Sequence, residues 1–368
     1  MARSSPTDPR RGAISSLSRE AMNPYLAQLY AALAAEGRAR GADARLDLRW
    51  LLDHRREVRW LHVHWPEPLY HWHRGPARFR PALSWFKLML FALRLRTARL
   101  LGYRIVWTIH QVYPHDTTQP RLDRAGGRAL AGAADVLLAH DSFTADLARR
   151  ELGSGIAAVT VVPHGSYVGV YPPGRPRDVV RANLGFAADD VMVLCFGELR
   201  GDSDVAVLLE AFAATDLANL RLVFAGNVKV PAVAASLEAA VGRDPRIVQI
   251  PGFVPPGAVA ELYGAADVAV MPRGNGGTSG SLILALSQGV PVIAADTPAS
   301  REAGADCESG WLFAPGDRAA LAAALVEAAM APREVRVRKS AAAAAAARKL
   351  DWAAGARIIA RKLAGIDG

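Results

Sequence analysis

The chain has 368 residues, 51% of them hydrophobic and 21% charged, which is typical of a folded globular protein and excludes a disordered one. Its length exceeds the size at which one hydrophobic core keeps growing, and therefore predicts two domains. Lys and Arg total 44 against 35 Asp and Glu, for a formal charge of +9 and a pI near 9.9, which favours anionic partners unless an Arg-rich composition alone explains the excess.

The first half of the chain alternates between helical and strand-like segments. Residues 23–37 place apolar side chains at helical spacing, with Asn23 and Pro24 as start signals and Gly37 as a stop signal. Strands of a parallel sheet are expected at residues 60–65, 103–110, 136–139 and 159–162. This alternation predicts an open α/β sheet, whose ligands lie beyond the carboxyl ends of the strands.

Residues 70–104 differ in composition, because aromatic side chains such as Trp72, Phe79 and Phe86 are mixed with many arginines. This mixture is typical of helices that lie in an anionic membrane interface. The alternative is an ordinary crossover helix whose arginines extend to solvent. We expect membrane contact here, although the basic residues do not all share one helical face.

A boundary between domains is expected near Tyr167, where the sequence becomes rich in proline and glycine and loses periodicity. Five apolar runs between residues 191 and 296 then predict the buried strands of a second α/β series. An Ala-rich segment near the end favours a helix. The expected division is a Rossmann-like lobe at 1–166, a linker at 167–181, a second Rossmann-like lobe at 182–345, and a C-terminal helix at 346–368 that packs back toward the first lobe.

Two cysteines occur in the sequence, Cys195 and Cys307, far apart and in apolar settings, so neither a disulfide framework nor a thiolate metal site is expected. The first twenty residues lack the apolar core of a signal peptide, and no run approaches the about 20 residues of a spanning helix. No zinc spacing is found, and nucleic acid is not an expected partner. These observations predict a cytoplasmic location.

The loop "GNGGTSGSLILALSQGVPVIAAD", residues 274–296, follows an expected strand and leads into a helix near Ser279. Backbone N–H groups of Thr278, Ser279 and Gly280 would then face an anion at the positive end of the helix dipole. Arg273 and Arg200, at the ends of two strands, are expected to reach the same anion. The alternative is a flexible surface loop with a serine cap.

Several segments in order resemble the GT-B glycosyltransferases: "VVPHG", "FGELR", "LVFAGN", the loop that begins at 274, and "GWLFAPGD". The resemblance implies two Rossmann-like lobes facing a central cleft, the second of which binds a nucleotide-sugar and the first its acceptor. Retaining enzymes of this fold carry two glutamates eight positions apart, and Gly276 and Leu284 stand at those places here. Ordinary retaining chemistry is therefore not expected.

A smaller set of bacterial β-mannosyltransferases of the xanthan type is similar in "TSGSLxLALSxGxPVI", "HxHWPE" and "WTIHxxxPHD". This resemblance implies an inverting enzyme that moves mannose from GDP-mannose to a polyprenyl-diphosphate-linked saccharide in exopolysaccharide biosynthesis. It also implies a peripheral position at the inner face of the plasma membrane. The alternatives are a retaining transferase with a divergent donor site and a non-catalytic protein that binds a nucleotide-sugar.

Inversion needs a general base for the acceptor hydroxyl and positive charge for the departing diphosphate. The candidates for catalysis lie in the first lobe: Glu67, Asp116 and His110, with Asp141 a weaker choice. His64, Trp65 and His164 are expected at the acceptor or the hinge. The expected donor-binding residues are Gly197, Arg200, Asn227, Arg273, Thr278, Ser279 and Gly280.

No metal or other cofactor is expected. Asp202 and Asp204 form the Asp-x-Asp pattern that single-lobe transferases use for Mg²⁺, but two acids at this spacing often occur by chance. A Mg²⁺ there would compensate for the lysine that the resembled family carries near the position of Ser203. His62 and His64 are expected to point to opposite faces of a strand and are therefore poor joint metal ligands.

Overall fold

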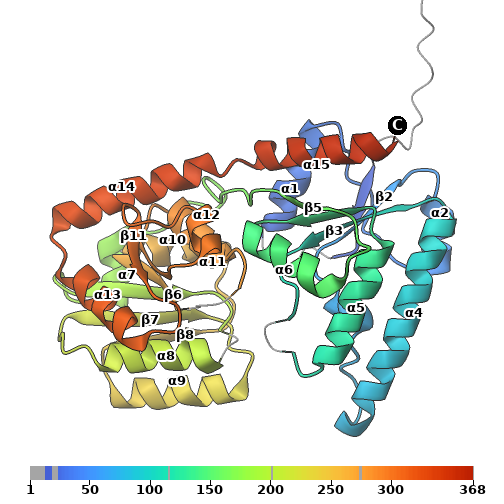
Figure 1. The fold of residues 1–368 in the computed structure, drawn as a ribbon. Coiled ribbons are helices and arrows are strands. Elements are labelled where there is room, and N and C mark those ends of the chain that lie inside the picture. The colour runs from blue at the N-terminus through green and yellow to red at the C-terminus, as the bar shows by residue number, and fades with distance from the viewer. Residues whose placement is uncertain (1–12, 19–23, 115–116, 200–201, 273–275, 368) are drawn as a thin grey trace, which may run out of the picture. The chain divides into compact units, whose positions relative to one another are not determined.

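The computed structural model describes residues 13–18, 24–114, 117–199, 202–272 and 276–367 (Figure 1). The chain divides into two compact units. The first unit combines Met1–Gly165 with Asp351–Gly368, and the second is Ser166–Leu350. Each unit is built on a parallel sheet covered by helices, so the fold is α/β.

The sheet of the first unit has parallel strands in the order β1-β2-β3-β4-β5. The strands are β1 (Ile14–Ser16), β2 (Trp60–Val63), β3 (Arg104–Ile109), β4 (Val136–Ala139) and β5 (Val159–Val161). The helices are α1 (Tyr25–Ala35), α2 (Leu48–His54), α3 (Glu67–Tyr70), α4 (Arg80–Leu100), α5 (Pro120–Ala133), α6 (Ser142–Leu152) and α15 (Trp352–Asp367), with a 3₁₀ turn at Ala77–Phe79.

Side-chain alternation along β2 and β3 divides the first unit's core between the two faces of the sheet. Leu61 and Trp107 belong to the core on one face, together with residues of α4 and α5. Trp60 and Val106 belong to the core on the other face, together with residues of α1 and α15. Both faces are buried, which explains why these strands read as almost continuous apolar runs.

The second sheet has parallel strands in the order β11-β10-β9-β6-β7-β8. The strands are β6 (Val191–Phe196), β7 (Leu220–Gly226), β8 (Ile247–Pro251), β9 (Val268–Met271), β10 (Val292–Ala295) and β11 (Gly310–Phe313). The helices are α7 (Arg177–Asn183), α8 (Asp202–Ala213), α9 (Pro231–Arg243), α10 (Pro256–Ala265), α11 (Gly280–Ser287), α12 (Pro298–Glu302), α13 (Arg318–Met330) and α14 (Arg333–Lys349).

The strand order of this second sheet reverses direction between β6 and β9, which pair with each other. In open α/β sheets this switch point leaves a crevice outside the carboxyl ends of the strands, where ligands bind. The loops that follow β6 and β9 therefore mark the candidate ligand site of this unit.

Several short elements escaped the sequence-based prediction, among them β1, β11 and α2. β1, with the sequence Ile-Ser-Ser, is too short and polar to give an apolar period. β11 begins with Gly310, whose missing Cβ would lie 2.0 Å from the Val292 carbonyl oxygen of the neighbouring strand. α2 spans only 7 residues, and its start signal is Asp47, whose carboxylate accepts a hydrogen bond from the Trp50 N–H.

The expected C-terminal helix at 346–368 is interrupted. α14 ends at Lys349, within the second unit, and α15 starts at Trp352, within the first. The Asp351 carboxylate accepts hydrogen bonds from the N–H groups of Ala353 and Ala354, at 2.9 and 3.2 Å, and so begins a new helix. The boundary between the units therefore lies after Leu350 rather than after residue 345.

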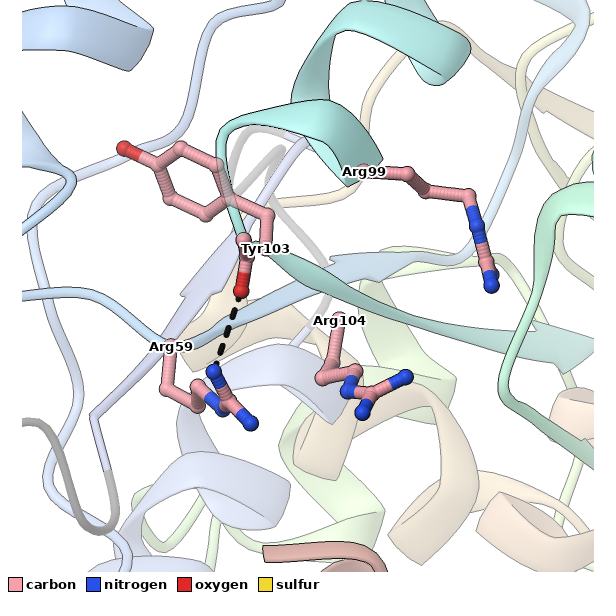
Figure 2. A pocket seen from close by; sticks show the side chains of 5 residues that line it. Arg59, Arg99, Tyr103 and Arg104 are labelled. Carbon is pink, nitrogen blue, oxygen red and sulfur yellow. Dashed lines mark hydrogen bonds between the residues drawn. The ribbon is translucent and has the colours of Figure 1, made fainter.

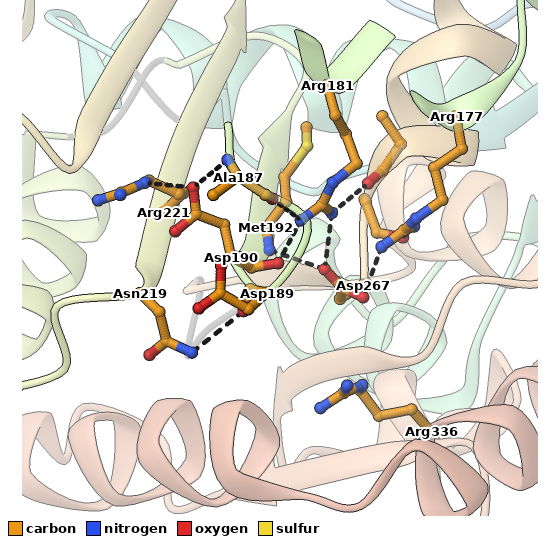
Figure 3. A network of polar contacts seen from close by, with 12 residues as sticks. Arg177, Arg181, Ala187, Asp189, Asp190, Met192, Asn219, Arg221, Asp267 and Arg336 are labelled. Atoms are coloured by element: carbon orange, nitrogen blue, oxygen red, sulfur yellow. Dashed lines mark hydrogen bonds and ion pairs between the residues drawn. The ribbon is translucent and has the colours of Figure 1, made fainter. Parts of the chain in front are cut away.

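The expected linker at 167–181 ends earlier than predicted, because residues 177–183 form α7. Arg177 and Arg181 lie four positions apart on this helix and donate to the two carboxylate oxygens of Asp267, at 2.6 and 3.0 Å (Figure 3). Asp267 precedes β9 and also accepts the Met192 N–H at 2.8 Å. This network anchors α7 at the amino edge of the sheet, where the strands begin.

No helix in the described part of the chain is long and apolar enough to cross a membrane.

Asp267→Asn should lower the free energy of unfolding by about 3 kcal/mol, because it leaves the buried Arg181 guanidinium without its counter-ion. Chemical denaturation of the full chain measures this loss. Asp189→Asn is the matched control, because this exposed side chain lies near the same sheet edge. Equal stability of the two variants would contradict the role given to Asp267.

Candidate functional site

The loops after β6 and β7 approach each other closely at the carboxyl edge of the second sheet. Gly197 and Gly226 have φ angles of +124° and +141°, which only glycine adopts without strain. A Cβ on Gly226 would lie 1.9 Å from the Gly197 carbonyl oxygen, and a Cβ on Gly197 would lie 2.8 Å from Ser281 Oγ. Backbone thus packs against backbone here, next to the start of α11.

The N-terminus of α11 supplies hydrogen-bond donors to the same place. The Ser279 hydroxyl accepts the Leu282 N–H at 3.3 Å and caps the helix. Gly280 and Ser281 contribute the first N–H groups of this helix, which belong to the four without a partner inside a helix. Together with the helix dipole, these groups favour an anion.

A cation also lies at this edge. The loops run side by side, because the Leu199 N–H donates to the Asn227 carbonyl oxygen at 2.9 Å and Leu199 forms a parallel bridge with Val228. Lys229 Nζ lies 2.6 Å from Glu198 Oε1, so an ion pair joins the two loops. We call Gly197–Leu199, Gly226–Lys229 and Thr278–Ser281 together the anion site.

The structure brings together five of the residues predicted to bind the donor: Gly197, Asn227, Thr278, Ser279 and Gly280. Arg200 and Arg273 lie outside the described residues. Lys229 was missed by the sequence analysis, although its position just beyond the strand that ends at Gly226 was a signal. Asp202 begins α8 and Asp204 lies within it. The described ranges contain no group of three His, Cys, Asp or Glu side chains that could hold a metal.

In the first unit, a cluster of histidines lies at the carboxyl edge of the sheet. His64, His110 and His140 follow directly after β2, β3 and β4, and His164 follows β5. With His62 on β2 they form what we call the histidine cluster. Successive parallel strands end at the same edge, which brings together side chains that are far apart in sequence.

Tyr25 of α1 lies at the centre of this cluster, with its ring 4.9 Å from the His110 ring and 5.0 Å from the His164 ring. Its hydroxyl donates to His140 Nε2 at 2.8 Å, since His140 Nδ1 donates to the Val162 carbonyl oxygen at 2.9 Å. A further bond joins His64 Nδ1 and His110 Nε2 at 3.2 Å. These bonds fix the ring orientations.

The expectation that His62 and His64 point to opposite faces is wrong. Their ring centroids lie 4.0 Å apart. The physical reason is the period of two in a strand, because residues two positions apart share a face. His62 Nε2 is bonded to the Thr108 hydroxyl at 2.8 Å, while His62 Nδ1 is buried without a hydrogen-bond partner in the described structure.

The histidine cluster is uncharged at neutral pH. Burial, together with a smaller contribution from the neighbouring His140, lowers the pKa of His62 and of His164 to about 3. Burial and the other histidines also hold the pKa of His64 and of His110 well below the ordinary value. A base with so low a pKa takes up a proton weakly, so His110 is better suited to bind than to accept a proton.

Glu67 begins α3, just beyond β2, and Trp65 precedes it. The Trp65 ring stacks on His110, with centroids 4.5 Å apart and an interplanar angle of 14°. Burial raises the pKa of Glu67, while a hydrogen bond from Gln111 opposes this shift. Of the other candidates, Asp116 lies outside the described residues, and Asp141 is a helix cap that accepts the Thr144 N–H at 2.7 Å.

A second polar group near Glu67 was missed by the sequence analysis. His71 Nε2 lies 2.5 Å from Asp123 Oδ1, and the Thr117 hydroxyl donates to Asp123 Oδ2. Burial alone would raise the pKa of Asp123, but these hydrogen bonds lower it, so the carboxylate is ionised. No sequence pattern joins His71 to Asp123, because the fold alone brings α3 to α5.

A shallow pocket of about 190 Å³ lies at the opposite edge of the first sheet, where β3 begins (Figure 2). Arg59, Arg99 and Arg104 line it. Arg104 and Arg99 pair with Asp135 at 2.9 and 3.3 Å, and Arg59 donates to the Gly102 carbonyl oxygen at 3.1 Å. These arginines already have partners, so the pocket is a structural feature of the sheet edge.

Comparison with known proteins identifies the class of this chain. Residues 190–330 match the family of glycosyl transferases group 1. Among solved structures, the Anabaena protein Alr3699/HepE in complex with UDP-glucose superposes with a TM-score of 0.72 at 16% identity, covering 96% of this chain and 99% of that one. WaaG, a glycosyltransferase involved in lipopolysaccharide biosynthesis, gives 0.63 at 15% identity, with coverages of 96% and 99%. Residues 190–330 are thus a group 1 glycosyltransferase domain, and the chain has the GT-B fold, as its motifs predicted.

Curated relatives of this chain have names that specify the sugar donor or the acceptor. The GDP-mannose:glycolipid 4-β-D-mannosyltransferase of Xanthomonas campestris pv. campestris is 29% identical over 293 residues, which cover 79% of this chain and 75% of that protein. The D-inositol 3-phosphate glycosyltransferase of Geodermatophilus obscurus is 33% identical over 237 residues, covering 60% and 51%. The chain is thus homologous to a GDP-mannose-dependent β-mannosyltransferase, as predicted.

Lowering the pH should reduce the free energy of unfolding of the first unit. The unfolded chain binds protons at its histidines below about pH 6.5, whereas His62 and His164 in the folded chain do not until near pH 3. Stability is therefore complete above pH 6.5 and falls as the pH falls, by about 1.4 kcal/mol per pH unit for each such histidine. Denaturant unfolding at a series of pH values measures the slope.

His62→Asn should reduce this slope, because one buried histidine is removed from the cluster. His54→Gln is the matched control, since His54 lies outside the cluster and stacks on Trp50. A slope that is the same in both variants would show that the cluster does not control acid stability.

Proposed function

We propose that this protein transfers mannose from GDP-mannose to a lipid-linked saccharide, with inversion at the anomeric carbon. The observation that carries the proposal is the homology to the Xanthomonas GDP-mannose:glycolipid 4-β-D-mannosyltransferase, because it covers 79% of the chain. The residues at positions 276 and 284 support the proposal, because retaining enzymes carry glutamates there. In this chain they are Gly276 and the buried Leu284. The acceptor in this proposal is a polyprenyl-diphosphate-linked saccharide of exopolysaccharide biosynthesis.

The anion site of the second unit is suited to the donor diphosphate. Its glycines leave room for the phosphates to approach the backbone, and the N–H groups at the start of α11 can donate hydrogen bonds to phosphate oxygens. Structural neighbours of this fold have been solved with UDP and UDP-glucose, which supports a nucleotide-sugar as the ligand class. The chemistry proposed here requires no metal, because helix amides and basic side chains supply the stabilising charge.

Glu67 of the first unit is our candidate for the general base. The acceptor hydroxyl oxygen bonds to the anomeric carbon as the bond from that carbon to the diphosphate oxygen breaks. The electron pair of the broken bond leaves with the diphosphate, and Glu67 takes the hydroxyl proton. A raised pKa suits this role, because a base is most effective when its pKa approaches the working pH.

Trp65, two residues before Glu67, stacks on His110 at the same sheet edge, and these two rings are suited to contact the acceptor sugar. His64 supports His110 through their hydrogen bond, and His164 contacts Tyr25 in the same cluster. Because these imidazoles are neutral, they act as hydrogen-bond donors and acceptors rather than as cations.

Helix α4 supports a location at an anionic membrane surface, and the proposed surface is the inner face of the plasma membrane. Its buried side chains share one face, while a second apolar stripe faces solvent: Phe86, Met89, Leu93 and Leu100 of α4, and Phe79 just before it, are 55%, 58%, 58%, 88% and 50% exposed. By helical spacing, Arg94 borders this stripe on one side and Arg96 on the other. An apolar stripe flanked by arginines suits insertion at the level of anionic headgroups.

Glu67→Gln should reduce kcat for mannose transfer by about 10²- to 10³-fold and leave GDP binding unchanged, because the base is lost and the donor site is intact. GDP release with a glycolipid acceptor measures the rate, and NMR of the product gives its anomeric configuration. Glu36→Gln, at the exposed end of α1, is the control.

An α-linked product would identify a retaining enzyme. GDP-mannose binding without turnover on any glycolipid would identify a non-catalytic binder. An unchanged rate for Glu67→Gln would exclude Glu67 as the base.

Replacing Phe86, Met89 and Leu93 by serine should reduce binding to vesicles that contain anionic phospholipid by at least about tenfold. The thermal unfolding midpoint should not fall, because these side chains are exposed. Co-sedimentation with vesicles measures the effect. The control is Met330→Ser with Val337→Ser, which removes exposed apolar side chains from the second unit, and equal binding of the two variants would contradict the membrane face.

A further inference from the structure

The ion pair between Glu198 and Lys229 lies where a phosphate would bind. Glu198 follows Gly197 in the turn after β6, which is the first strand of the second unit and the one beside the strand-order reversal. In this architecture the first strand-to-helix turn carries the phosphate-binding backbone. Lys229 follows β7 and reaches the same turn, 2.6 Å from Glu198.

The surrounding backbone holds this pair in place. The loops that carry the two residues are joined by the Leu199–Asn227 hydrogen bond and by the close packing of Gly226 on Gly197. Ser281 Oγ of α11 also lies against Gly197. The pair is therefore adjacent to the helix N-terminus that completes the anion site, and not on a distant part of the surface.

The exposure and the charges of Glu198 and Lys229 favour a functional role for their ion pair over a purely structural one. The Lys229 side chain is 51% exposed and that of Glu198 is 34% exposed, so little stability is gained from the ion pair itself. A carboxylate beside an anion site repels the anion, and a pair that served only stability would be better placed elsewhere. An ammonium with a carboxylate partner can instead exchange that partner for phosphate.

We propose that Lys229 binds the donor diphosphate and that Glu198 holds the Lys229 ammonium at the anion site until the donor arrives. This inference rests on the proposed nucleotide-sugar donor but not on its nucleobase or its sugar. Lys229 then supplies the positive charge for which the sequence near Ser203 offers no lysine. On donor binding, the ammonium exchanges the carboxylate for phosphate oxygens, and the carboxylate is left to solvent.

Substitutions of Lys229 and of Glu198 are then expected to have opposite effects on nucleotide binding. Lys229→Ala should weaken GDP binding by about 10- to 100-fold, the contribution of hydrogen bonds to a charged group. Glu198→Gln should strengthen it by about 3- to 10-fold, because a competing and repelling negative charge is removed. Lys229→Arg should restore most of the lost affinity.

Calorimetric titration of the full chain with GDP, UDP, GMP and guanosine tests the proposal. The effect of Lys229→Ala should be largest for the diphosphates and smallest for guanosine. Arg318→Ala is the matched control, because Arg318 forms a similar exposed ion pair with Glu210 at 2.7 Å in the same unit. Thermal unfolding of each variant shows whether the fold is retained.

The outcomes separate this inference from the proposed function. If UDP binds in place of GDP and still depends on Lys229, the GDP-mannose assignment fails and the role of Lys229 stands. If both Lys229→Ala and Glu198→Gln bind GDP as the unmodified chain does, the pair is structural and the inference fails. Weaker binding in both variants would also overturn it, because the carboxylate would then belong to the binding site.

Discussion

The common edge at which parallel strands end is the constraint on which both candidate sites depend. In the second unit this edge brings Gly197 and Gly226 so close that a side chain on Gly226 would overlap a carbonyl oxygen. In the first unit the same geometry brings together histidines that follow different strands. Neither site is built on one continuous segment, so each depends on the order of strands in its sheet.

The two sites differ in their electrostatics, and the difference follows from burial. The histidine cluster is enclosed and loses its charge, which leaves a set of neutral donors and acceptors around Tyr25. The anion site keeps a charged pair at the surface, where water and loop backbone support both ions. A sugar hydroxyl suits the first environment, and a diphosphate suits the second.

Much of the fold follows from the sequence, because strands buried on both faces are continuous apolar runs that stand out from their surroundings. The prediction of β4 matches its observed bounds, Val136–Ala139, while Ile14–Ser16 carried no comparable signal. The glycine-rich loop before α11 predicted the candidate anion site, because glycines leave room for an anion to approach the backbone. Lys229, His71 and Asp123 could not be assigned in the same way, since their partners come from other elements. Whether Glu67 or another side chain accepts a proton is a question of solvation, which a linear pattern does not contain.

The interruption at Asp351 has a consequence for how the protein is made. Ile359 and Leu363 of α15 complete a core that begins with Leu26 and Leu29 near the other end of the chain. Topologically, Ser166–Leu350 is a domain inserted into another domain. During synthesis the inserted domain is complete before its host, which lacks part of its interior until α15 leaves the ribosome. Removal of α15 would thus destabilise the domain that is translated first.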